Sequence, residues 1–301
     1  MKAKTTHTFK TVGACEIRLD VYEGMGAGAR PVIVWLHGGA LMFGSRGMIH
    51  PAQVEHYVNA GYTVIAVDYR LAPETKLPEI LQDVQDAIAW TRSEGARLFN
   101  LDLTRLAIIG HSAGGYLTLL AGCYVRPRPQ ALVAFYGYGD IVGPWYSMPS
   151  AFYCQRPQVS RIEAVAAVGE TEISESPRRD SAEFDPARDR SRFYLYCRQR
   201  GCWPQAATGL DPRDDYDAFL PYCPVRQVAA DHPPTMLLHG DADTDVPYEQ
   251  SVMMARALAD ASITHQLQSI PGGAHGFDAD MGDPALTAAF ADVLWFLTQH
   301  V

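Results

Sequence analysis

Residues 106–115 read LAIIGHSAGG, in which a short apolar run leads directly into the pattern G-x-S-x-G. The run LAIIG is too short for a typical helix and is apolar throughout, which predicts a buried strand. The residues that follow, from Gly115 to Cys123, are typical of a helix. Small residues at both ends of the pentapeptide let the backbone turn sharply and hold a serine in a strained conformation. We therefore predict that Ser112 lies at a strand-to-helix turn, with its hydroxyl exposed above a sheet.

Further short apolar runs recur along the chain. They are PVIVWL at 31–36, YTVIAVDY at 62–69, ALVAFYG at 131–137 and TMLLHG at 235–240. Strands that are apolar on both faces belong to mostly parallel sheets covered by helices on both sides. Residues 78–94, 248–259 and 284–298 carry apolar residues at the three- and four-residue spacing of amphipathic helices. The β-α-β-α alternation predicts an open α/β fold with a mostly parallel central sheet flanked by helices.

One connection is much longer than an ordinary crossover between strands. It runs from near Tyr136 to Thr235 and is irregular in composition, rich in proline, arginine and aromatic residues. We expect residues 143–230 to be an insertion that folds over the sheet as a small helical cap. Its aromatic side chains should mostly hold the insertion together, and some should line a pocket. The whole chain, 1–301, is then one catalytic domain with a cap inserted in it.

Composition excludes several classes of protein. The chain has 301 residues and a net charge of −9, and 48% of its residues are apolar, which fits a globular domain with a sizeable core. An acidic chain argues against a nucleic-acid partner, because that affinity draws on clustered basic residues. No window approaches the roughly 20 apolar residues of a membrane span. The first ten residues do not resemble a secretion signal, so we expect a cytoplasmic protein without stable membrane insertion, and a homodimer is left open.

The cysteines give no sign of a metal or redox site. None of the six is part of a C-x-x-C pair, which argues against zinc and against a thioredoxin-type couple. Cys197 and Cys202 could be bridged in an exported protein, but in a reducing cytosol we expect free thiols. No cofactor or metal is expected.

A serine hydroxyl needs a base to take its proton, and ten histidines compete for that role. His275 lies in the glycine-rich loop GGAHGF at 272–277, after a predicted strand at 265–270. A loop from the last strand can reach the carboxyl edge of the sheet, where Ser112 is expected. His111 adjoins Ser112, but its side chain should point elsewhere from the turn. We therefore predict His275 as the base.

The base in turn needs a carboxylate that fixes its tautomer. Asp241, Asp243 and Asp245 lie in one loop, directly after the predicted strand at 235–240. All three follow the carboxyl end of a strand, and their positions alone do not separate them. The two that are not catalytic are expected to cap the loop.

A developing oxyanion requires backbone N–H donors. Gly38 and Gly39 directly follow the predicted strand at 31–36, and glycines allow backbone amides to approach a substrate oxygen closely. We expect these two residues to supply one donor. The backbone N–H of Ala113, next to the nucleophile, is expected to supply the other.

Taken together, five motifs resemble the α/β-hydrolase superfamily, and specifically its esterase and lipase branch near hormone-sensitive-lipase-like and acetyl-esterase proteins. They are HGG at 37–39, DYRLAPE at 68–74, GHSAGG at 110–115, GDADTDVP at 240–247 and GGAHGF at 272–277. In that family the acid of a G-x-x-D-x-x-V-P loop is the aspartate three residues after the glycine, so the resemblance implies Asp243. It also implies that Asp68, Arg70 and Glu74 brace the loop that carries HGG.

The resemblance is closer to some branches than to others. Ala40 and His111 stand where hormone-sensitive-lipase-like members usually have Gly and Asp. The acid loop and GGAHGF look closer to prolyl-oligopeptidase-like and dienelactone-hydrolase-like relatives. The resemblance implies an α/β-hydrolase fold and a serine carboxylesterase that acts on small or medium carboxylic esters. The alternatives are an amide hydrolase, such as an aryl formamidase or an aminopeptidase, and a ligand receptor without turnover.

Overall fold

An eight-stranded sheet forms the centre of this computed structural model. The structure describes residues 4–177, 179–279, 281 and 283–301. In pairing order the strands are β1 (Thr5–Val12), β2 (Cys15–Tyr22), β4 (Thr63–Val67), β3 (Arg30–Leu36), β5 (Leu101–His111), β6 (Ala131–Phe135), β7 (Thr235–Gly240) and β8 (His265–Ile270). Every neighbouring pair from β4 to β8 is parallel, and β1 and β2 are antiparallel strands at one edge. The predicted α/β class with a mostly parallel sheet is confirmed.

The apolar runs of the sequence form the middle of this sheet. Every residue of β4, β6 and β7 is buried, as expected for strands that are covered on both faces. The central strands β3 and β5 pair in parallel from Val32 opposite Leu106 to Leu36 opposite Gly110. The loops that follow β3 and β5 therefore leave the sheet side by side, and these are the loops that carry the HGG and G-x-S-x-G motifs.

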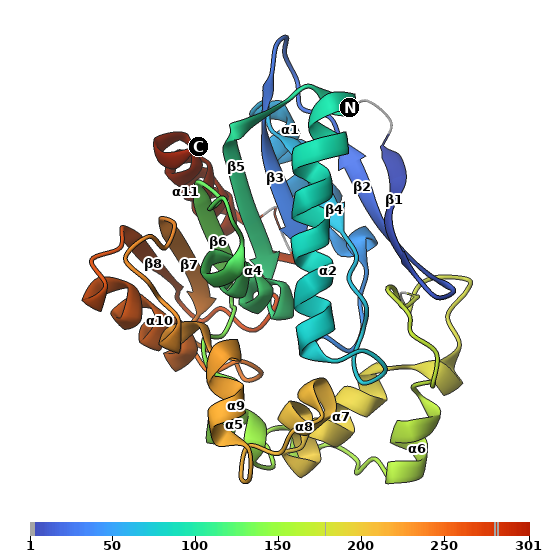
Figure 1. Ribbon diagram of the computed structural model, residues 1–301. Coiled ribbons are helices and arrows are strands. Elements are labelled where there is room, and N and C mark those ends of the chain that lie inside the picture. Colours follow the sequence, from blue (N-terminus) through green and yellow to red (C-terminus); the bar gives the residue numbers. More distant parts are fainter. Residues whose placement is uncertain (1–3, 178, 280, 282) are drawn as a thin grey trace.

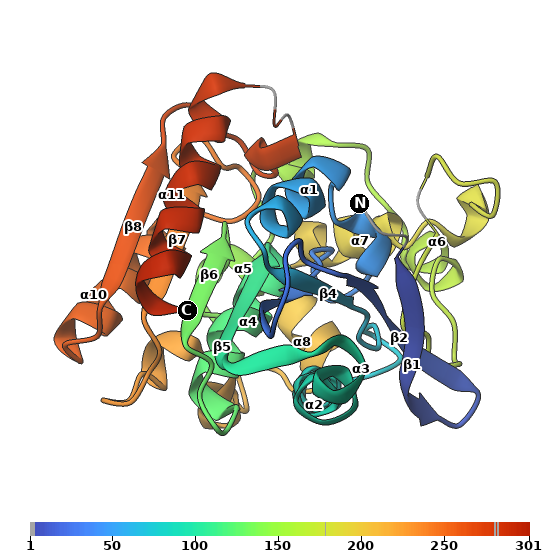
Figure 2. The ribbon, with the colours of Figure 1, turned by 90° about the horizontal axis from the view of Figure 1, so that it is seen from above.

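Helices cover both faces of the sheet (Figures 1 and 2). The longer ones are α1 (Pro51–Asn59), α2 (Leu77–Trp90), α4 (Ala113–Tyr124), α10 (Glu249–Asp260) and α11 (Pro284–His300). Helices α2 and α4 pack against the face that carries Val32 and Val34 of β3, whereas α1 and α11 pack against the face that carries Ile33. Alternate residues of one strand thus enter opposite layers of the core.

The predicted helices occur with small shifts at their ends. Helices α2, α10 and α11 correspond to the predictions at 78–94, 248–259 and 284–298. The first of these ends earlier, because the chain passes from α2 into a π-helical turn, η2 (Thr91–Gly95), and then into α3 (Ala96–Phe99). A short 3₁₀ turn, η1 (Arg46–Met48), precedes α1.

Residues 143–230 form a layer of short helices beyond the carboxyl ends of the parallel strands (Figure 1). The elements are α5 (Pro144–Ser147), η3 (Tyr153–Gln155), α6 (Arg161–Ala166), η4 (Pro186–Arg188), α7 (Ser191–Arg200), α8 (Trp203–Thr208), α9 (Tyr216–Phe219), η5 (Leu220–Tyr222) and η6 (Pro224–Arg226). The buried Trp203 stacks on Tyr146, with ring centroids 4.0 Å apart, and donates its Nε1–H to the Ala40 carbonyl at 2.9 Å. The stacked rings hold this segment together, and the hydrogen bond from Trp203 joins it to the loop that follows β3.

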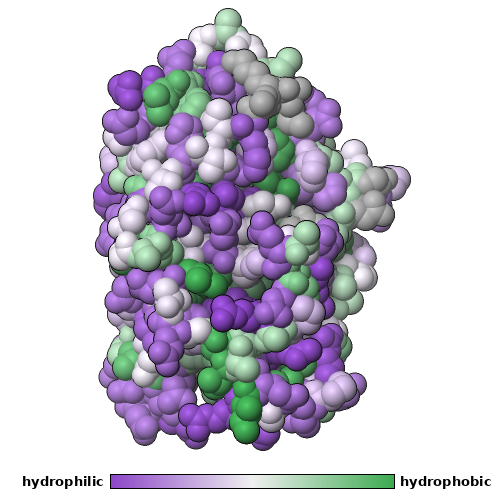
Figure 3. Space-filling view, turned by 90° about the vertical axis from the view of Figure 1, so that its right-hand side faces the viewer, coloured by the Kyte–Doolittle hydropathy of each residue, from purple (hydrophilic) through white to green (hydrophobic). Residues whose placement is uncertain are grey.

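All six cysteines are free thiols. Within the described ranges, no helix is long and apolar enough to cross a bilayer, and no group of three or more His, Cys, Asp or Glu residues is placed to hold a metal ion. Figure 3 shows that hydrophilic side chains cover most of the face turned toward the viewer and that apolar side chains form small separate groups there.

Candidate active site

Ser112 lies at the sharp turn between β5 and α4. Its backbone has φ 55° and ψ −118°, a left-handed conformation that residues other than glycine rarely adopt. Its N–H donates to the carbonyl of Phe135 at 2.9 Å, which ties the turn to the neighbouring strand β6. Strain of this kind persists only where the surrounding structure imposes it, and it occurs frequently at functional sites.

The glycines on either side of Ser112 are required by the close approach of backbone segments. A Cβ added at Gly110 would lie 2.1 Å from the carbonyl oxygen of Gly114, and a Cβ at Gly114 would lie 2.1 Å from that of Leu36. Both distances are far below van der Waals contact. The G-x-S-x-G spacing therefore reflects the packing of β5, α4 and the end of β3 against one another.

The structure brings together the three residues of the predicted triad. The Nε2 atom of His275 is 3.0 Å from Ser112 Oγ, and its Nδ1 atom is 2.7 Å from Asp243 Oδ2. The other oxygen of Asp243 accepts the backbone N–H groups of Asp245, at 2.8 Å, and Val246, at 2.9 Å. The carboxylate is thus fixed on one side by its own loop and directed on the other at the imidazole.

Burial and hydrogen bonding shift the two titrating groups of this line in opposite directions. Burial would raise the pKa of Asp243, but hydrogen bonds from His239 and His275 outweigh it and hold that pKa below its ordinary value. Burial would lower the pKa of His275, but the hydrogen bond to Asp243 and the charges of Asp245 and Asp243 raise it above the ordinary value of a histidine. The pair therefore favours an ionised aspartate beside a basic imidazole.

The other two aspartates of the acid loop have different partners. Asp241 accepts the backbone N–H of Gly272 at 2.6 Å, so it links the acid loop to the loop that carries His275. Asp245 forms an ion pair with Arg198 of α7 at 2.6 Å. Geometry thus separates three residues that their sequence positions left equivalent.

Two other histidines near the site, His239 and His111, have partners of their own. His239 has its Nδ1 atom 2.7 Å from Ser251 Oγ and its Nε2 atom 3.0 Å from the Val246 carbonyl. His111 stacks on Phe135 with ring centroids 4.4 Å apart, and its Nδ1 atom is 2.9 Å from Asp278. Both side chains are held by local partners.

The predicted oxyanion residues lie next to Ser112. A Cβ added at Gly38 would be 3.2 Å from Ser112 Cβ, so the HGG loop passes directly beside the serine. Gly39 has φ 111°, and a Cβ there would lie 1.9 Å from the Phe43 carbonyl oxygen. Ala113 is the first residue of α4, where backbone N–H groups have no acceptor within the helix.

The loop that carries HGG is held by a stacked pair of rings. His37 stacks on Tyr69 with ring centroids 4.1 Å apart, and the Tyr69 hydroxyl donates to the His37 carbonyl at 2.8 Å. Burial lowers the pKa of His37 to about 4. His37 is therefore neutral near pH 7 and serves as a packing group.

All three residues expected to brace this loop make ion pairs, but only those of Asp68 and Glu74 connect to the segment that follows β3, whereas Arg70 pairs with residues of α2 and of the 143–230 segment. Asp68 pairs with Arg46, and Arg70 pairs with Asp83 at 2.8 Å. Glu74 pairs with Arg190 at 2.7 Å, with both side chains almost fully buried. Arg190 also donates hydrogen bonds to the carbonyl of Met42, in the segment that follows β3, and to the carbonyl of Ala72, in the segment that follows β4.

Asp278 and Tyr136 form a buried network beside the triad that the sequence did not indicate. Asp278 accepts hydrogen bonds from the Tyr136 hydroxyl and, at 2.6 Å, from Gln53 of α1, and it also contacts His111. The ring of Tyr136 meets that of His275 edge to face, with centroids 4.7 Å apart. The loop of His275 is thereby fixed to α1, to the end of β6 and to the serine turn.

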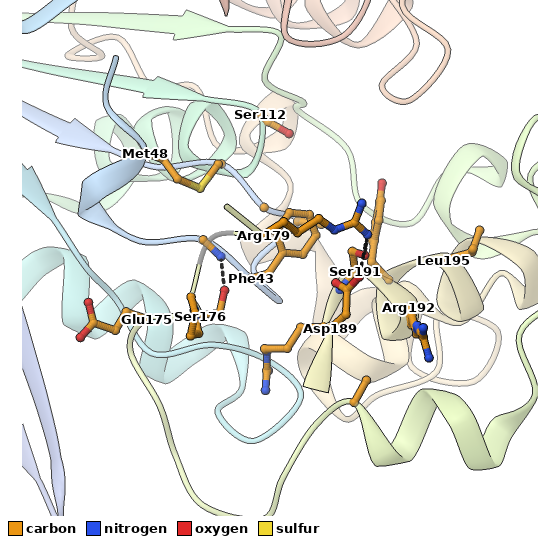
Figure 4. Close-up of a pocket in the computed structure, with 18 of the residues that line it drawn as sticks. Phe43, Met48, Ser112, Glu175, Ser176, Arg179, Asp189, Ser191, Arg192 and Leu195 are labelled. Carbon is orange, nitrogen blue, oxygen red and sulfur yellow. Dashed lines mark hydrogen bonds and ion pairs between the residues drawn. The ribbon is translucent and has the colours of Figure 1, made fainter. Parts of the chain in front are cut away.

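Ser112 and His275 open onto a pocket of about 1510 Å³. The loops at the carboxyl edge of the sheet form one wall, and residues of the 143–230 segment form the other. Figure 4 shows Asp189, Ser191, Arg192 and Leu195 of that segment at a distance from Ser112, across the pocket. A pocket of this size, beside a serine that is hydrogen-bonded to a histidine, can hold a small organic molecule.

Two family models match separate parts of the chain. Residues 19–142 match a family described as BD-FAE, and residues 194–301 match the prolyl oligopeptidase family. Among curated proteins, the non-reducing polyketide synthase adrD of Penicillium rubens is 28% identical over 96% of this chain, and pkbA of Emericella nidulans is 29% identical over 83%. The chain spans only 13% and 12% of the lengths of those two proteins.

Solved structures resemble the chain over almost its whole length. A protein of unknown function from Staphylococcus aureus has a TM-score of 0.78 at 23% identity, covering 99% of both chains. An alpha/beta hydrolase superfamily protein from Enterococcus faecalis has a TM-score of 0.74 at 24% identity, covering 99% of this chain and 100% of its own. A thermophilic esterase from Thermogutta terrifontis has a TM-score of 0.67 at 20% identity, covering 99% and 92%. At these identities the likeness establishes a shared fold.

Proposed function

Because the chain is an esterase-like protein of the α/β-hydrolase superfamily, we propose that it is a serine carboxylesterase acting on small to medium carboxylic esters. The observation that carries this proposal is the hydrogen-bonded line from Ser112 through His275 to Asp243, of which Ser112 and His275 line a pocket. A serine, a base and a carboxylate in this order are the parts that acyl transfer requires.

The first half of the reaction makes an acyl-enzyme. Ser112 Oγ forms a bond to the ester carbonyl carbon while His275 Nε2 takes the hydroxyl proton, and the carbonyl electron pair moves to oxygen. Backbone N–H groups of Ala113 and of the Gly38-Gly39 loop donate to that oxyanion. Each such donor contributes about 3 kcal/mol of transition-state stabilisation. His275 then protonates the alkoxy oxygen, the carbon–oxygen bond breaks and the alcohol leaves.

The second half repeats these roles with water as the nucleophile. His275 takes a proton from water while the water oxygen attacks the acyl carbonyl carbon. The bond from that carbon to Ser112 Oγ then breaks as His275 returns the proton to Oγ, which releases the carboxylic acid and restores the serine hydroxyl. The ionised Asp243 accepts the Nδ1–H of the imidazole throughout, so Nε2 is left free to accept a proton at each attack. The residues of the chain suffice for this cycle.

The pocket and its wall are compatible with the proposed substrate size. We assign residues 143–230 the role of a cap, because its side chains face Ser112 across the pocket. A cavity of about 1510 Å³ accommodates a small or medium ester with space to spare. The Thermogutta terrifontis esterase has been solved with butyrate and with propionate bound, which supports short acyl chains here.

Amide hydrolysis is the second candidate. The prolyl oligopeptidase family model covers residues 194–301, the part of the chain that holds both Asp243 and His275. The same triad cleaves amides where the site protonates the leaving amine efficiently. Amide and ester activity differ in the leaving group, so substrates that vary only there separate the two candidates.

A hydrolysis panel tests the proposed function. The purified enzyme is given p-nitrophenyl acetate, butyrate, octanoate and laurate, an acetylated sugar, formylkynurenine and an aminoacyl anilide, and each kcat/KM is divided by the uncatalysed rate. We expect the largest ratios of kcat/KM to the uncatalysed rate for the acetate, butyrate and octanoate esters. The Ser112→Ala variant should hydrolyse none of these esters measurably faster than the uncatalysed reaction. Preference for formylkynurenine or the anilide would replace the esterase proposal with the amide one. Binding without turnover of any substrate would indicate a receptor.

A further inference from the structure

A second carboxylate lies beside the imidazole of His275. The Oδ2 atom of Asp245 is 3.6 Å from His275 Nε2, the same nitrogen that faces Ser112. Asp243 contacts the opposite nitrogen, Nδ1. A carboxylate this close favours the protonated imidazolium. Asp245 therefore acts on the atom that receives the serine proton, and it lines the pocket as well.

The other oxygen of Asp245 is held by α7 of the 143–230 segment. Arg198 Nη1 donates to Asp245 Oδ1 at 2.6 Å, and both Nη atoms donate to the Asp245 carbonyl at 3.1 Å. Tyr194, one helical turn earlier, donates its hydroxyl to the same Oδ1 at 2.5 Å and accepts from Arg198 at 2.7 Å. The carboxylate is thus shared between a guanidinium on one side and the imidazole on the other.

Arg198 is fixed in place by its surroundings. Its side chain is 3% exposed, and its guanidinium lies over four aromatic rings at 4.9–5.7 Å from their centroids. The rings belong to Trp145, Tyr146, Tyr153 and Tyr194. Charges removed from water interact more strongly than charges at the surface. The positive charge opposite Asp245 is therefore a permanent part of this wall of the pocket.

We propose that Asp245 and Arg198 are positioning residues that together set the basicity of His275. Asp245 stabilises the imidazolium, and Arg198 offsets part of that effect from the far side of the carboxylate. The general base is thereby coupled to the segment that forms the second wall of the pocket. This inference rests on the proposed function, in which His275 is the base.

Other charged and titratable groups surround the imidazole and stay constant in the test. His239 lies in β7 and Asp243 in the loop that follows it, and Asp278 lies on the loop of His275 itself. The others are Tyr136 after β6, His111 and Ser112 at the serine turn, and Tyr153 and Tyr194 beside Asp245. The pKa of His275 lies above its ordinary value, because the Asp243 hydrogen bond and the charges of Asp245, Asp243 and Asp278 outweigh burial. Among the described residues, Arg198 supplies the permanent positive charge that pairs with Asp245.

The test is the pH profile of kcat/KM for a neutral nitrophenyl ester in wild type, Asp245→Asn, Arg198→Met and the double variant. Removing the carboxylate destabilises the imidazolium, so the acid limb of Asp245→Asn should move to lower pH. Removing the guanidinium leaves Asp245 uncompensated, so the limb of Arg198→Met should move to higher pH. We expect a downward shift of about one pH unit in Asp245→Asn and a smaller upward shift in Arg198→Met, with the limb of the double variant between those of wild type and Asp245→Asn.

A structural role alone would not produce shifts in opposite directions that partly offset each other in the double variant. Limbs that stay at the wild-type pH, or that move in the same direction in both single variants, would overturn the proposal. If Arg198→Met does not fold, Arg198→Lys replaces it in the test, because lysine keeps a positive charge near the same place. The acid limb of Arg198→Lys should lie closer to that of wild type than to the position expected without the cation. A limb that moves up by a full unit in Arg198→Lys would also overturn it.

A direct titration separates this inference from the proposed function. The His275 imidazole is followed by NMR against pH in the Ser112→Ala background, with and without Asp245→Asn, where no turnover is needed. The imidazole should titrate at lower pH when Asp245 is replaced. An unchanged titration would refute the role of Asp245 even if Ser112 proves to be the nucleophile, whereas a shifted titration in a protein that cleaves no ester would refute only the proposed function.

Discussion

Replacing Ser112 with alanine is expected to lower kcat for p-nitrophenyl butyrate by about 10⁶-fold. The hydroxyl that forms the acyl-enzyme is lost, and neither His275 nor the oxyanion donors can replace it. The fold should survive, because alanine meets the same positive-φ strain at this position as serine does. The measurement is steady-state turnover after active-site titration, which corrects for traces of contaminating wild-type enzyme.

Ser191→Ala is the matched control for that experiment. Ser191 also lines the pocket, and its hydroxyl accepts from Arg179 at 2.7 Å. It lies across the pocket in the 143–230 segment, so its removal should change kcat no more than a few-fold, as is usual for groups outside the chemistry. Near-normal turnover in Ser112→Ala would remove the nucleophile from the proposed mechanism, whatever the control does.

Asp243→Asn is expected to lower kcat by about 10⁴-fold. The Oδ1 atom of Asp243 accepts two backbone N–H groups, from Asp245 and Val246, which only the oxygen of an asparagine can replace. The carboxamide nitrogen must then face His275 Nδ1 and donate to it. The imidazole would carry its proton on Nε2, which is the wrong tautomer for taking a proton from Ser112.

The same substitution at Asp241 is the control, because Asp241 lies in the same loop. Its carboxylate accepts the N–H of Gly272, and its side chain is exposed. Asp241→Asn should retain kcat within a few-fold, and Asp245→Asn should mainly shift the pH profile. Equal losses in Asp241→Asn and Asp243→Asn would show that the loop as a whole matters, and the assignment of the acid to Asp243 would be wrong.

Local sequence patterns predicted the centre of the sheet and missed one edge. Strand β7 has the bounds of the run TMLLHG, which is mostly apolar because the strand is buried on both faces. Strand β1 is largely exposed and reads TTHTFKTV, so polarity hides it. Helix α1, at Pro51–Asn59, has a proline at its first position and buries Val54, Tyr57 and Val58 on one face, so its sequence does carry a helical pattern.

The site was predictable where its chemistry depends on local backbone. The glycines around Ser112 and in the loop of His275 occur where the chain must turn sharply, and the structure places the two side chains 3.0 Å apart. Which of the aspartates faces His275 depends on a contact between two loops, so residue positions alone did not separate them. The resemblance implied Asp243, and in the structure this residue lies 2.7 Å from His275.

The remaining functional groups depend on contacts between distant segments. Arg198 meets Asp245 from the layer beyond the sheet, and Tyr136 meets Asp278 across 142 positions of sequence. Neither pair lies in a motif. Residues that act through such contacts cannot be recognised from local sequence. The sequence therefore identifies Asp245 only as one of three candidate acids.

Covalent labelling by a fluorophosphonate tests most directly whether Ser112 is the nucleophile. The reagent requires a serine activated by its base, so wild-type protein should take up one adduct per chain, on the peptide that contains Ser112, with turnover lost in proportion. Ser112→Ala should remain unlabelled under the same conditions, and Ser191→Ala should label like wild type. An adduct on any other residue, or no adduct on a folded wild-type protein that still cleaves esters, would contradict the mechanism.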